Sequence, residues 1–393
     1  MDDDVIPRRR QAADGRPTLL VDHWYSHAVG HVIEALRRCQ AYHAADPSLR
    51  VSLVLNGASP TELASCVPFV EQAFAVPYSS FGPSREDPRK ALRGVPRDWD
   101  HVVHHPASVD PEQQRFVGLQ RYYAAARRHF RGRLGEGVVG VSPPAYEPHQ
   151  TLRLALPEAD RERATRELDG RLTIAVMPAG SGARRLYPSL ASWRLVLDEL
   201  ERRIPGVGFV FVGRLGAGGG QTVSGIARGE VDRLRESRRL AVDAFDRPIL
   251  SQLATVEAAR LFLSPHTGFG MAALAVGTPW LTLSGGDWHE YFFNGVPFHS
   301  VIPKGRSHEA FARGRSLPLV DPDSDGEGPR AWALSAARLR GDLDEIADAA
   351  VRLVDGDVTY EEALASYFPR LLDAYGGDRA PVRTFEDVHV DYL

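Results

Sequence analysis

Histidines crowd the segment that follows the first apolar run of the chain. The run Thr18–Asp22 (TLLVD) predicts a short buried strand, and the next nine residues contain His23, His27 and His31. Imidazole titrates near neutral pH and Asp22 adds a carboxylate, so the segment holds groups that can remove a proton from a hydroxyl. A general base is therefore expected here.

The same three histidines are spaced four residues apart, which on one helix would form a metal-binding face. The strand end at Asp22 and the glycine at Gly30 argue against a continuous helix through them. A second group, His101, His104 and His105, raises the same question. We expect no bound metal at either group.

A strand-to-helix turn in the second half of the chain has the features of an anion site. Arg260–Ser264 (RLFLS) predicts a strand, and Thr267-Gly268-Phe269-Gly270 opens a helix of small residues. The first amide N–H groups of a helix lack partners within it and attract anions. The glycines leave room for a pyrophosphate, and Thr267 adds a hydroxyl donor. Such a turn is also common as a purely packing feature.

The loop PAGSGARRLYP, between another predicted strand and helix, is the second candidate for phosphate binding. Three small residues allow a ligand to approach the backbone, and two arginines supply fixed positive charge for phosphate oxygens. These residues are Gly180, Ser181, Gly182, Arg184 and Arg185. The alternative is a loop with two solvated arginines.

Strand and helix patterns alternate along the chain, twice over. The predicted strands are residues 18–22, 50–55, 70–76, 101–104, 137–142, 172–177, 208–212, 260–264 and 279–284. The predicted helices are residues 30–44, 111–131, 158–168, 189–203 and 226–237, one from about 268, and 333–354 and 360–374. Such alternation implies right-handed βαβ units and parallel sheets, in which ligands bind beyond the carboxyl ends of the strands.

The domain boundaries follow from this alternation and from a proline-rich interval near its middle. We expect a disordered lead-in at residues 1–16, an N-terminal Rossmann-like domain at 17–150 that binds the acceptor, and a linker at 151–170. A C-terminal Rossmann-like domain at 171–357 binds the donor, and residues 358–393 form a last helix and tail.

Composition excludes several classes of protein. The chain has 393 residues, a formal net charge of −4 and 25% charged residues, which gives no sign of a nucleic-acid partner. Two cysteines, Cys39 and Cys66, are too few for a disulfide framework. The polar start is unlike a signal peptide, and no apolar run has the length of a membrane span. We therefore expect a cytoplasmic protein.

The segments around the two loops resemble a known family. A strand followed by Ser264, Thr267-Gly268, Met271 and then Gly-Thr-Pro is similar to the donor signature of the ADP-heptose heptosyltransferases of glycosyltransferase family nine. The basic residue ahead of Tyr187-Pro188 is similar to that family's phosphate loop. The similarity covers residues 171–285 well and the N-terminal half faintly. It implies a GT-B fold, in which two doubly wound domains face a central cleft and the last helix crosses back to the N-terminal domain.

The resemblance also implies site residues. Ser181, Arg185, Thr267, Gly268 and Met271 would contact the donor nucleotide. His266 stands where the family has an acidic residue, and we count it with Phe269 and Gly270 as donor-contacting. Asp287, in Gly-Gly-Asp-Trp-His-Glu, is expected to hold donor sugar hydroxyls, as acidic residues do in many GT-B enzymes.

The base is chosen by a second resemblance. Gly30-His31 with Leu36 is similar to the Gly-His-x-x-x-x-Leu of many GT-B enzymes, in which the histidine is the base. Heptosyltransferases carry an aspartate at this place. His31 is therefore our candidate base, with His27 and Asp22 as the alternatives.

Taken together, these features predict an enzyme. We expect a glycosyltransferase that moves a hexosyl or heptosyl group from a nucleotide diphosphate sugar to a hydroxyl acceptor, without a cofactor or metal and with inversion. A surface polysaccharide and a natural product are both reasonable acceptors. The alternatives are a GT-B-fold nucleotide-sugar epimerase and a catalytically silent nucleotide-sugar-binding partner protein.

Overall fold

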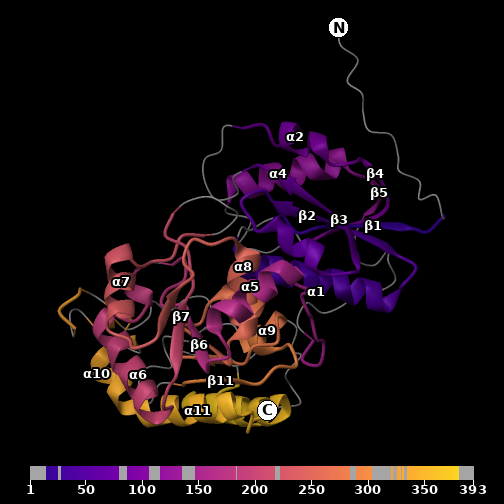
Figure 1. Cartoon of the computed structure of the whole chain (residues 1–393). Coiled ribbons are helices and arrows are strands. Elements are labelled where there is room, and N and C mark those ends of the chain that lie inside the picture. The colour runs from indigo at the N-terminus through magenta and orange to yellow at the C-terminus, as the bar shows by residue number, and fades with distance from the viewer. Residues whose placement is uncertain are drawn as a thin grey trace. The chain divides into compact units, whose positions relative to one another are not determined.

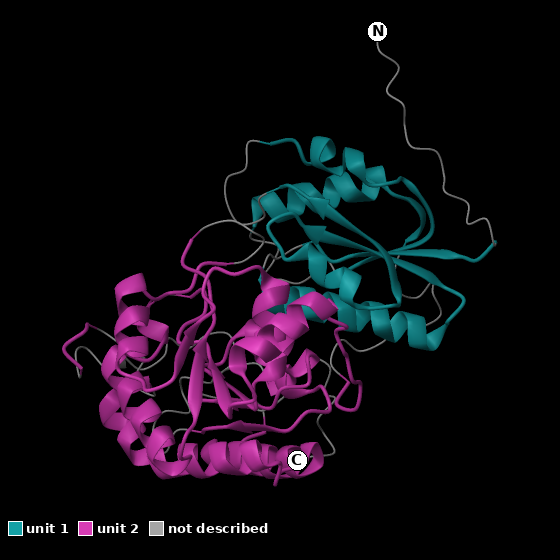
Figure 2. Cartoon of the chain, in the orientation of Figure 1, with its two compact units in different colours: residues 1–145, 218–221 teal, residues 146–217, 222–393 magenta. Residues whose placement is uncertain are grey.

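The structure is a computed structural model. It describes residues 15–24, 28–78, 86–105, 116–134, 147–182, 184–216, 222–283, 289–302, 320–321, 325–328, 330–331 and 334–379. Its contacts divide the chain into two compact units (Figure 2): unit 1, residues 1–145 and 218–221, and unit 2, residues 146–217 and 222–393. Residues 146–170 thus group with unit 2.

Unit 1 is built on one parallel sheet of five strands in the order β3-β2-β1-β4-β5. Its elements are β1 (Thr18–Asp22), α1 (Val29–Ala45), β2 (Arg50–Asn56), the 3₁₀ helix η1 (Thr61–Cys66), β3 (Val70–Val76), α2 (Pro88–Ala91), η2 (Leu92–Gly94), β4 (Asp98–His104), α4 (Val117–His129) and β5 (Arg131–Leu134). In Figure 1, α1 lies on one side of the sheet and α2 and α4 on the other. This is the doubly wound arrangement expected from the alternating pattern.

Unit 2 contains a six-stranded sheet, parallel throughout, in the order β11-β10-β9-β6-β7-β8. Its strands are β6 (Thr173–Val176), β7 (Gly208–Phe211), β8 (Ala241–Asp243), β9 (Leu261–Ser264), β10 (Trp280–Thr282) and β11 (Phe298–Ser300), besides a separate antiparallel pair, β12 (Val320–Asp321) and β13 (Arg330–Ala331). Its helices are α5 (Glu158–Leu168), η4 (Arg184–Leu186), α6 (Leu190–Arg203), α7 (Arg228–Glu236), α8 (Ile249–Ala258), α9 (Gly268–Ala275), η5 (His289–Phe292), α10 (Ala336–Leu339), η8 (Arg340–Asp342), α11 (Leu343–Asp355) and α12 (Tyr360–Ala374).

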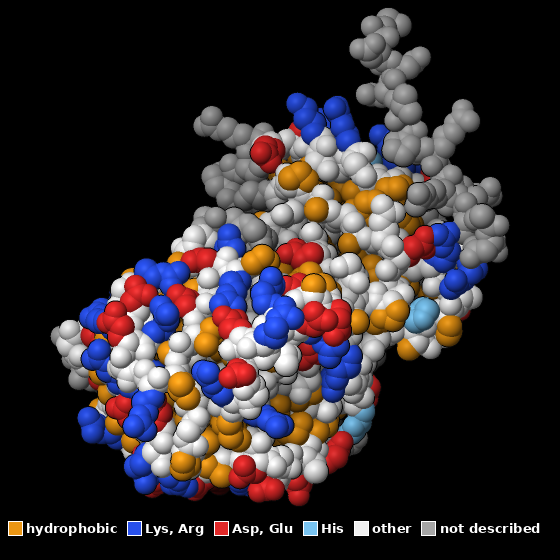
Figure 3. Space-filling model, viewed as in Figure 1, with side chains coloured by type: hydrophobic (Ala, Val, Ile, Leu, Met, Phe, Trp, Pro, Cys, Tyr) orange, Lys and Arg blue, Asp and Glu red, His pale blue; other side chains and the backbone are white. Residues whose placement is uncertain are grey.

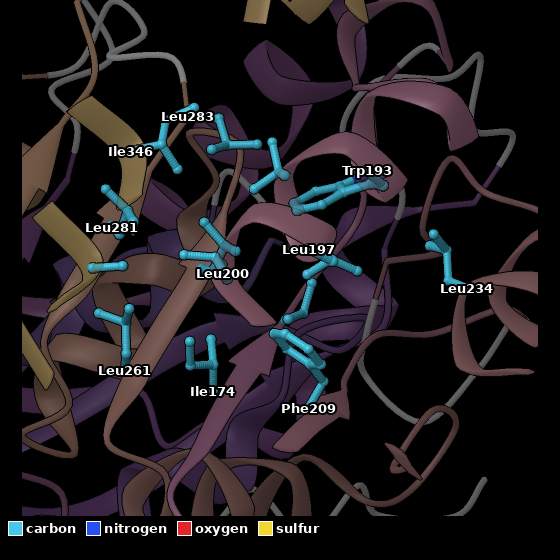
Figure 4. Packing of buried hydrophobic residues seen from close by; sticks show 14 of the residues in the cluster. Ile174, Trp193, Leu197, Leu200, Phe209, Leu234, Leu261, Leu281, Leu283 and Ile346 are labelled. Atoms are coloured by element: carbon cyan, nitrogen blue, oxygen red, sulfur yellow. The ribbon is translucent and has the colours of Figure 1, made fainter. Parts of the chain in front are cut away.

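A hydrophobic core of unit 2 forms where α6, α7 and α11 cover one face of this sheet. Figure 4 shows Trp193, Leu197 and Leu200 of α6 packed around Ile174 and Phe209 of the strands. All five side chains are buried. Strands buried on both faces read as continuous apolar runs, which explains why β6, β7 and β9 stand out in the sequence.

Helix α12 belongs to unit 2. Tyr367 of α12 packs against Phe298 of β11, with ring centroids 5.6 Å apart, and the Tyr360 hydroxyl donates a 2.6 Å hydrogen bond to the Pro148 carbonyl. Both contacts tie the C-terminal helix to its own unit. The expected return of residues 358–393 to the N-terminal domain stays a prediction.

Most predicted elements are present, and the differences have physical reasons. Helix α4 ends at His129 rather than residue 131, and the next strand is β5, whose four residues are all exposed. An exposed edge strand of sequence RGRL has no apolar run to reveal it. The strand predicted at 137–142 lies outside the described residues. β8 (AVD) and β11 (FHS) lack a run of apolar residues and were not predicted, and α8 was not predicted either.

The surface of unit 2 mixes charges of both signs, as Figure 3 shows for the viewed face. Ion pairs account for part of this mixture, such as Arg161 with Glu257 and Arg228 with Asp243, each at 2.8 Å. In the described part of the chain, no helix is long and apolar enough to cross a membrane.

Candidate functional site

The sheet of unit 2 places both predicted phosphate loops at one edge. The chain runs from β6 to β7 and β8 on one side, then returns to β9, β10 and β11 on the other. The order therefore reverses between β6 and β9, and adjacent loops diverge at such a switch point and leave room for a ligand. The loop after β6 holds Gly180–Arg185, and the turn after β9 holds His266 and Thr267.

The two loops touch each other. A Cβ atom added at Gly180 would lie 2.9 Å from Thr267 Cγ2 and 2.9 Å from the Tyr187 hydroxyl. Two segments about 90 residues apart, both predicted to bind phosphate, therefore form one surface. We call this surface the donor edge, and it comprises residues 180–187 and 266–271.

Helix α9 begins at the donor edge. Thr267 is its N-cap residue, but its side chain makes no capping hydrogen bond. Thr267 is 9% exposed, and its Oγ1 has no hydrogen-bond partner among the described residues. A buried hydroxyl beside the free amides of a helix start is placed to donate to an anion.

The side chains at the start of α9 serve the core rather than a ligand. Phe269 is 5% and Met271 3% exposed, and the Phe269 ring packs 5.5 Å from that of Phe262. A Cβ atom at Gly270 would lie 2.2 Å from the Trp280 ring, so that residue must lack a side chain for packing. Any donor contact by these residues would have to be made by the backbone.

Tyr187 holds the shape of the loop after β6. Its hydroxyl accepts a 2.5 Å hydrogen bond from the Gly182 amide, and Gly225 donates a 2.7 Å hydrogen bond to the Gly180 carbonyl. A Cβ atom at Gly182 would lie 2.7 Å from the same hydroxyl. Glycine is thus required at 180 and 182 by the tyrosine, whether or not a ligand approaches.

The two arginines of the loop differ in their partners. Arg184 pairs with Glu230, a buried carboxylate that also accepts a hydrogen bond from the Ala227 amide. Arg185 is exposed and makes no ion pair with a described residue. Arg185 is therefore the cation of the pair that can take a phosphate, while Ser181 lies exposed beside it.

His266 lies among aromatic rings. Its ring stacks on Tyr291 at 5.0 Å and lies 5.6 Å from Trp280 and 5.5 Å from Phe292. This packing fixes the imidazole next to Thr267 and Gly268. Asp287 lies outside the described residues, so its expected role with donor hydroxyls stays a prediction.

In unit 1 the order of strands reverses between β1 and β4, and both strands end there in polar side chains. Asp22 pairs in register with His104, and His23 and His105 follow them. Successive side chains of a strand point to opposite faces, so each strand end sends one group to each side of the sheet.

On the α4 side, Asp22 is held by two donors. His104 Nδ1 lies 2.7 Å from one carboxylate oxygen, and the Tyr122 hydroxyl donates a 2.5 Å hydrogen bond to the other. Burial, and then the charge of Asp22, raises the pKa of Tyr122, which keeps its proton on the phenol. Asp22 is fully buried with both oxygens in use. It is therefore placed to orient His104 rather than to reach a substrate.

On the α1 side, His31 and Glu34 form a second pair. His31 Nδ1 lies 3.2 Å from Glu34 Oε2, and the two are neighbours on the first turn of α1. Burial favours a higher pKa for the Glu34 carboxyl, but the His31 hydrogen bond and neighbouring cationic groups outweigh it and lower the pKa. The His31 side chain is 27% exposed, and Nε2 is the ring nitrogen that does not face this carboxylate.

His23 completes the group on the α1 side. Its Nε2 lies 4.0 Å from Glu34 Oε2, and its side chain is fully buried. Burial lowers the pKa of His23 from 6.5 to about 3, so this imidazole is neutral at physiological pH. His27 lies outside the described residues.

Several partners were missed from the sequence alone. Glu34, Tyr122 and Tyr187 each hold a predicted residue or loop in place, and none was proposed. Of these, only Glu34 has a local signal, a carboxylate three residues after His31 on a predicted helix. Tyr122 meets Asp22 across 100 positions, and no local pattern reports such a contact.

Comparisons with known proteins agree with this architecture. No protein-family model and no curated protein matches the chain. A glycosyltransferase of family 9 from Veillonella parvula shares 13% identity, covers 86% of this chain and 97% of its own, and superposes with a TM-score of 0.57. Heptosyltransferase WaaC of E. coli with ADP shares 14% identity, covers 85% of this chain and 99% of its own, with a TM-score of 0.50.

The chain has the fold of the family 9 glycosyltransferases. The predicted α/β class with two doubly wound domains of the GT-B type is thereby confirmed. A structure assigned as a candidate UDP-N-acetylglucosamine 2-epimerase from Listeria monocytogenes matches at 8% identity and a TM-score of 0.35, covering 68% of this chain and 79% of its own. A match at that level carries no argument for the epimerase alternative.

The packing of Gly270 against Trp280 predicts the effect of Gly270→Ala. The added methyl group would overlap the indole, so we expect the free energy of unfolding to fall by about 1–3 kcal/mol. Gly229→Ala, where the added atom meets open space on α7, is the control and should be neutral or slightly stabilising. Urea denaturation measures both. A fully stable Gly270→Ala that loses nucleotide binding would instead show that this glycine serves the ligand.

The buried His23 predicts a pH dependence of stability. Because its pKa is about 3 in the folded chain and 6.5 ordinarily, the unfolded chain takes up the proton more readily below pH 6.5. As the pH is lowered from 6.5 to 5, protonation of this group in the unfolded chain therefore lowers the free energy of unfolding by up to about 2 kcal/mol. His23→Gln should show a flatter curve in chemical denaturation with EDTA present. Parallel curves for the two proteins would contradict this assignment.

Proposed function

We propose that this protein is a glycosyltransferase that moves a sugar from a nucleotide diphosphate donor to a hydroxyl acceptor. The observation that carries the proposal is the donor edge. A basic loop and a helix N-terminus, both predicted to bind phosphate, meet at the switch point of a parallel sheet. Glycosyltransferases share the fold, and one of them, WaaC of E. coli, is seen with ADP.

The donor edge offers what a departing diphosphate needs. The first amides of α9 and the Thr267 hydroxyl supply donors, and Arg185 supplies a positive charge without a competing ion pair in the described residues. Such fixed groups stabilise negative charge as it develops on the leaving group. This supports transfer that needs no metal at the diphosphate.

We assign the base to His31. In the pair with Glu34, the carboxylate orients the imidazole through Nδ1 and leaves Nε2 to accept the proton of the acceptor hydroxyl. The arrangement corresponds to the orienting group and base of hydrolytic triads. His104, oriented by Asp22 in the same way, is the second imidazole with this geometry.

Direct displacement with inversion fits these groups. A retaining double displacement would need a nucleophile that attacks the sugar, and Asp22, the carboxylate at the end of β1, is buried with both oxygens bound. A base acting on the acceptor hydroxyl suffices for a single displacement. The sugar is a hexose or a heptose, and surface polysaccharide and natural products are the acceptor classes considered.

A thermal-shift panel of ADP, UDP, GDP and their sugars tests the donor edge. A diphosphate at 100 times its dissociation constant stabilises the folded chain by about 2.7 kcal/mol. We expect one nucleotide to raise the Tm of the wild type, with or without EDTA, and Arg185→Ala to lose most of that shift. Arg184→Ala should lose less of it, because Arg184 is held by Glu230.

Arg194→Ala is the matched control for this panel. Arg194 is an exposed arginine of α6, outside the donor edge, and its replacement should leave the nucleotide shift unchanged. If no nucleotide shifts the Tm at millimolar concentration, the donor edge does not bind donor, and the proposed function is contradicted.

Replacement of His31 tests its role as the base. Once a donor and an acceptor are known, His31→Ala should lower kcat by roughly 10²–10⁴-fold, because a positioned base contributes about that much. The nucleotide shift of His31→Ala should equal that of the wild type, since His31 lies outside the donor edge. Donor consumption without acceptor that survives this change would favour the epimerase, and an unchanged kcat would move the role to His104.

A further inference from the structure

One cluster in unit 1 has the composition of a transition-metal site. A ligand atom each from His23, His31 and Glu34 lies within 4.8 Å of the others. His31 Nδ1 and His23 Nε2 are 3.2 Å and 4.0 Å from the same carboxylate oxygen, Glu34 Oε2. Two imidazoles and one carboxylate are the protein ligands of many zinc sites that keep a coordination position open.

The fold brings these ligands together from two elements. His31 and Glu34 are three residues apart on the first turn of α1, so they share a face of that helix. His23 follows β1 directly and contributes from the adjacent strand end. Its fully buried side chain is held in place by the core, whereas His31 is 27% exposed and gives an ion a route of entry.

The separations are close to those of a coordinated ion. Ligand atoms about 2.0–2.1 Å from a tetrahedral zinc lie roughly 3.3 Å from one another. The His31–Glu34 distance already has this value, at 3.2 Å, and the His23–Glu34 distance of 4.0 Å exceeds it by 0.7 Å. Small torsional changes of His31 and Glu34 would close the difference.

A neighbouring charge moderates the affinity of this cluster for a cation. Arg38 lies 4.0 Å from the other oxygen, Glu34 Oε1, and opposes a nearby cation. We expect the arginine to make binding weaker and reversible.

We propose that His23, His31 and Glu34 form a binding site for zinc or a similar divalent transition-metal ion, and that the bound ion inhibits the enzyme. The inhibition rests on the proposed function, whereas the binding does not. In the base form, His31 carries its proton on Nδ1 and its lone pair on Nε2. Coordination of the metal by Nδ1 reverses this, since Nε2 then carries the proton. An imidazole in that form cannot accept the proton of the acceptor hydroxyl.

Calorimetric titration with Zn²⁺ of the full chain, first stripped by a chelator, tests the site without any substrate. The wild type should bind one ion per chain. Loss of one ligand in His23→Gln, Glu34→Gln or His31→Ala should weaken binding by more than about 100-fold, since even changes to outer-shell partners cost 10- to 100-fold. Replacement of Zn²⁺ by Co²⁺ should give the absorption spectrum of a nitrogen- and oxygen-ligated ion in the wild type.

His149→Gln is the control. His149 also lies beside a carboxylate, 3.5 Å from Glu361, but on the surface of unit 2 and outside the cluster. Its replacement should leave Zn²⁺ binding unchanged. Because His31 is partly exposed, His31→Ala remains informative if a variant of buried His23 fails to fold. Absence of stoichiometric binding to the wild type, or equal losses in the control and the cluster variants, would overturn the site.

The inhibitory role is tested separately in the transfer assay. Zn²⁺ should lower the wild-type rate and EDTA should restore it. In folded His23→Gln, measured relative to its own rate without Zn²⁺, half-inhibition should need a Zn²⁺ concentration more than about 100-fold higher. Binding with the expected variant pattern but no change in rate would overturn the inhibition and leave the site. A chain with no transferase activity would overturn the proposed function, while the calorimetric result would still decide the site.

Discussion

Both candidate sites depend on the reversal of strand order within a parallel sheet. In unit 2 the reversal falls between β6 and β9, and in unit 1 between β1 and β4. Loops that leave neighbouring strands in opposite directions leave room for a ligand at the strand ends between them. Asp22 and His104 end adjacent strands in register, and the loops that follow β6 and β9 touch at Gly180 and Thr267.

At the donor edge, the packing of aromatic side chains is enough to explain the glycines that suggest a phosphate-binding loop. Gly180 and Gly182 make room for Tyr187, and Gly270 makes room for Trp280. These glycines would be needed even if no ligand ever bound, because a methyl group would overlap an aromatic side chain. The features that point to a ligand are of another kind. They are the buried Thr267 hydroxyl at the start of α9 and the exposed Arg185, neither of which has a partner in the described residues. The close packing that these glycines allow holds Thr267 and Arg185 where an anion could bind.

The histidines of unit 1 show how one carboxylate can select a tautomer. Asp22 holds Nδ1 of His104, and Glu34 holds Nδ1 of His31. Where Nδ1 donates to the carboxylate, Nε2 is left to accept a proton. Nε2 of His104 is buried, whereas the His31 side chain is 27% exposed. At His31 the same Nδ1 is the atom that faces His23 and Glu34, so catalysis and metal binding would require opposite tautomers. If the proposed site binds an ion, a proton and a metal ion would compete for Nδ1 of His31.

How much of this could be predicted from the sequence depends on the range of the interactions. Buried parallel strands are continuous apolar runs, and α1 and α12 are regular helical patterns. The alternation, the α/β class and the two loops that we predict to bind phosphate were therefore visible in local order. Exposed β5 and three-residue β8 and β11 carry too little local signal, and the structure alone reveals them.

Which side chains meet was decided by tertiary structure. The pairing of Asp22 with Tyr122, of Gly180 with Thr267 and of His23 with Glu34 joins residues that are distant in sequence or lie on different elements, and only the register of the strands and the packing of helices on them bring such groups together.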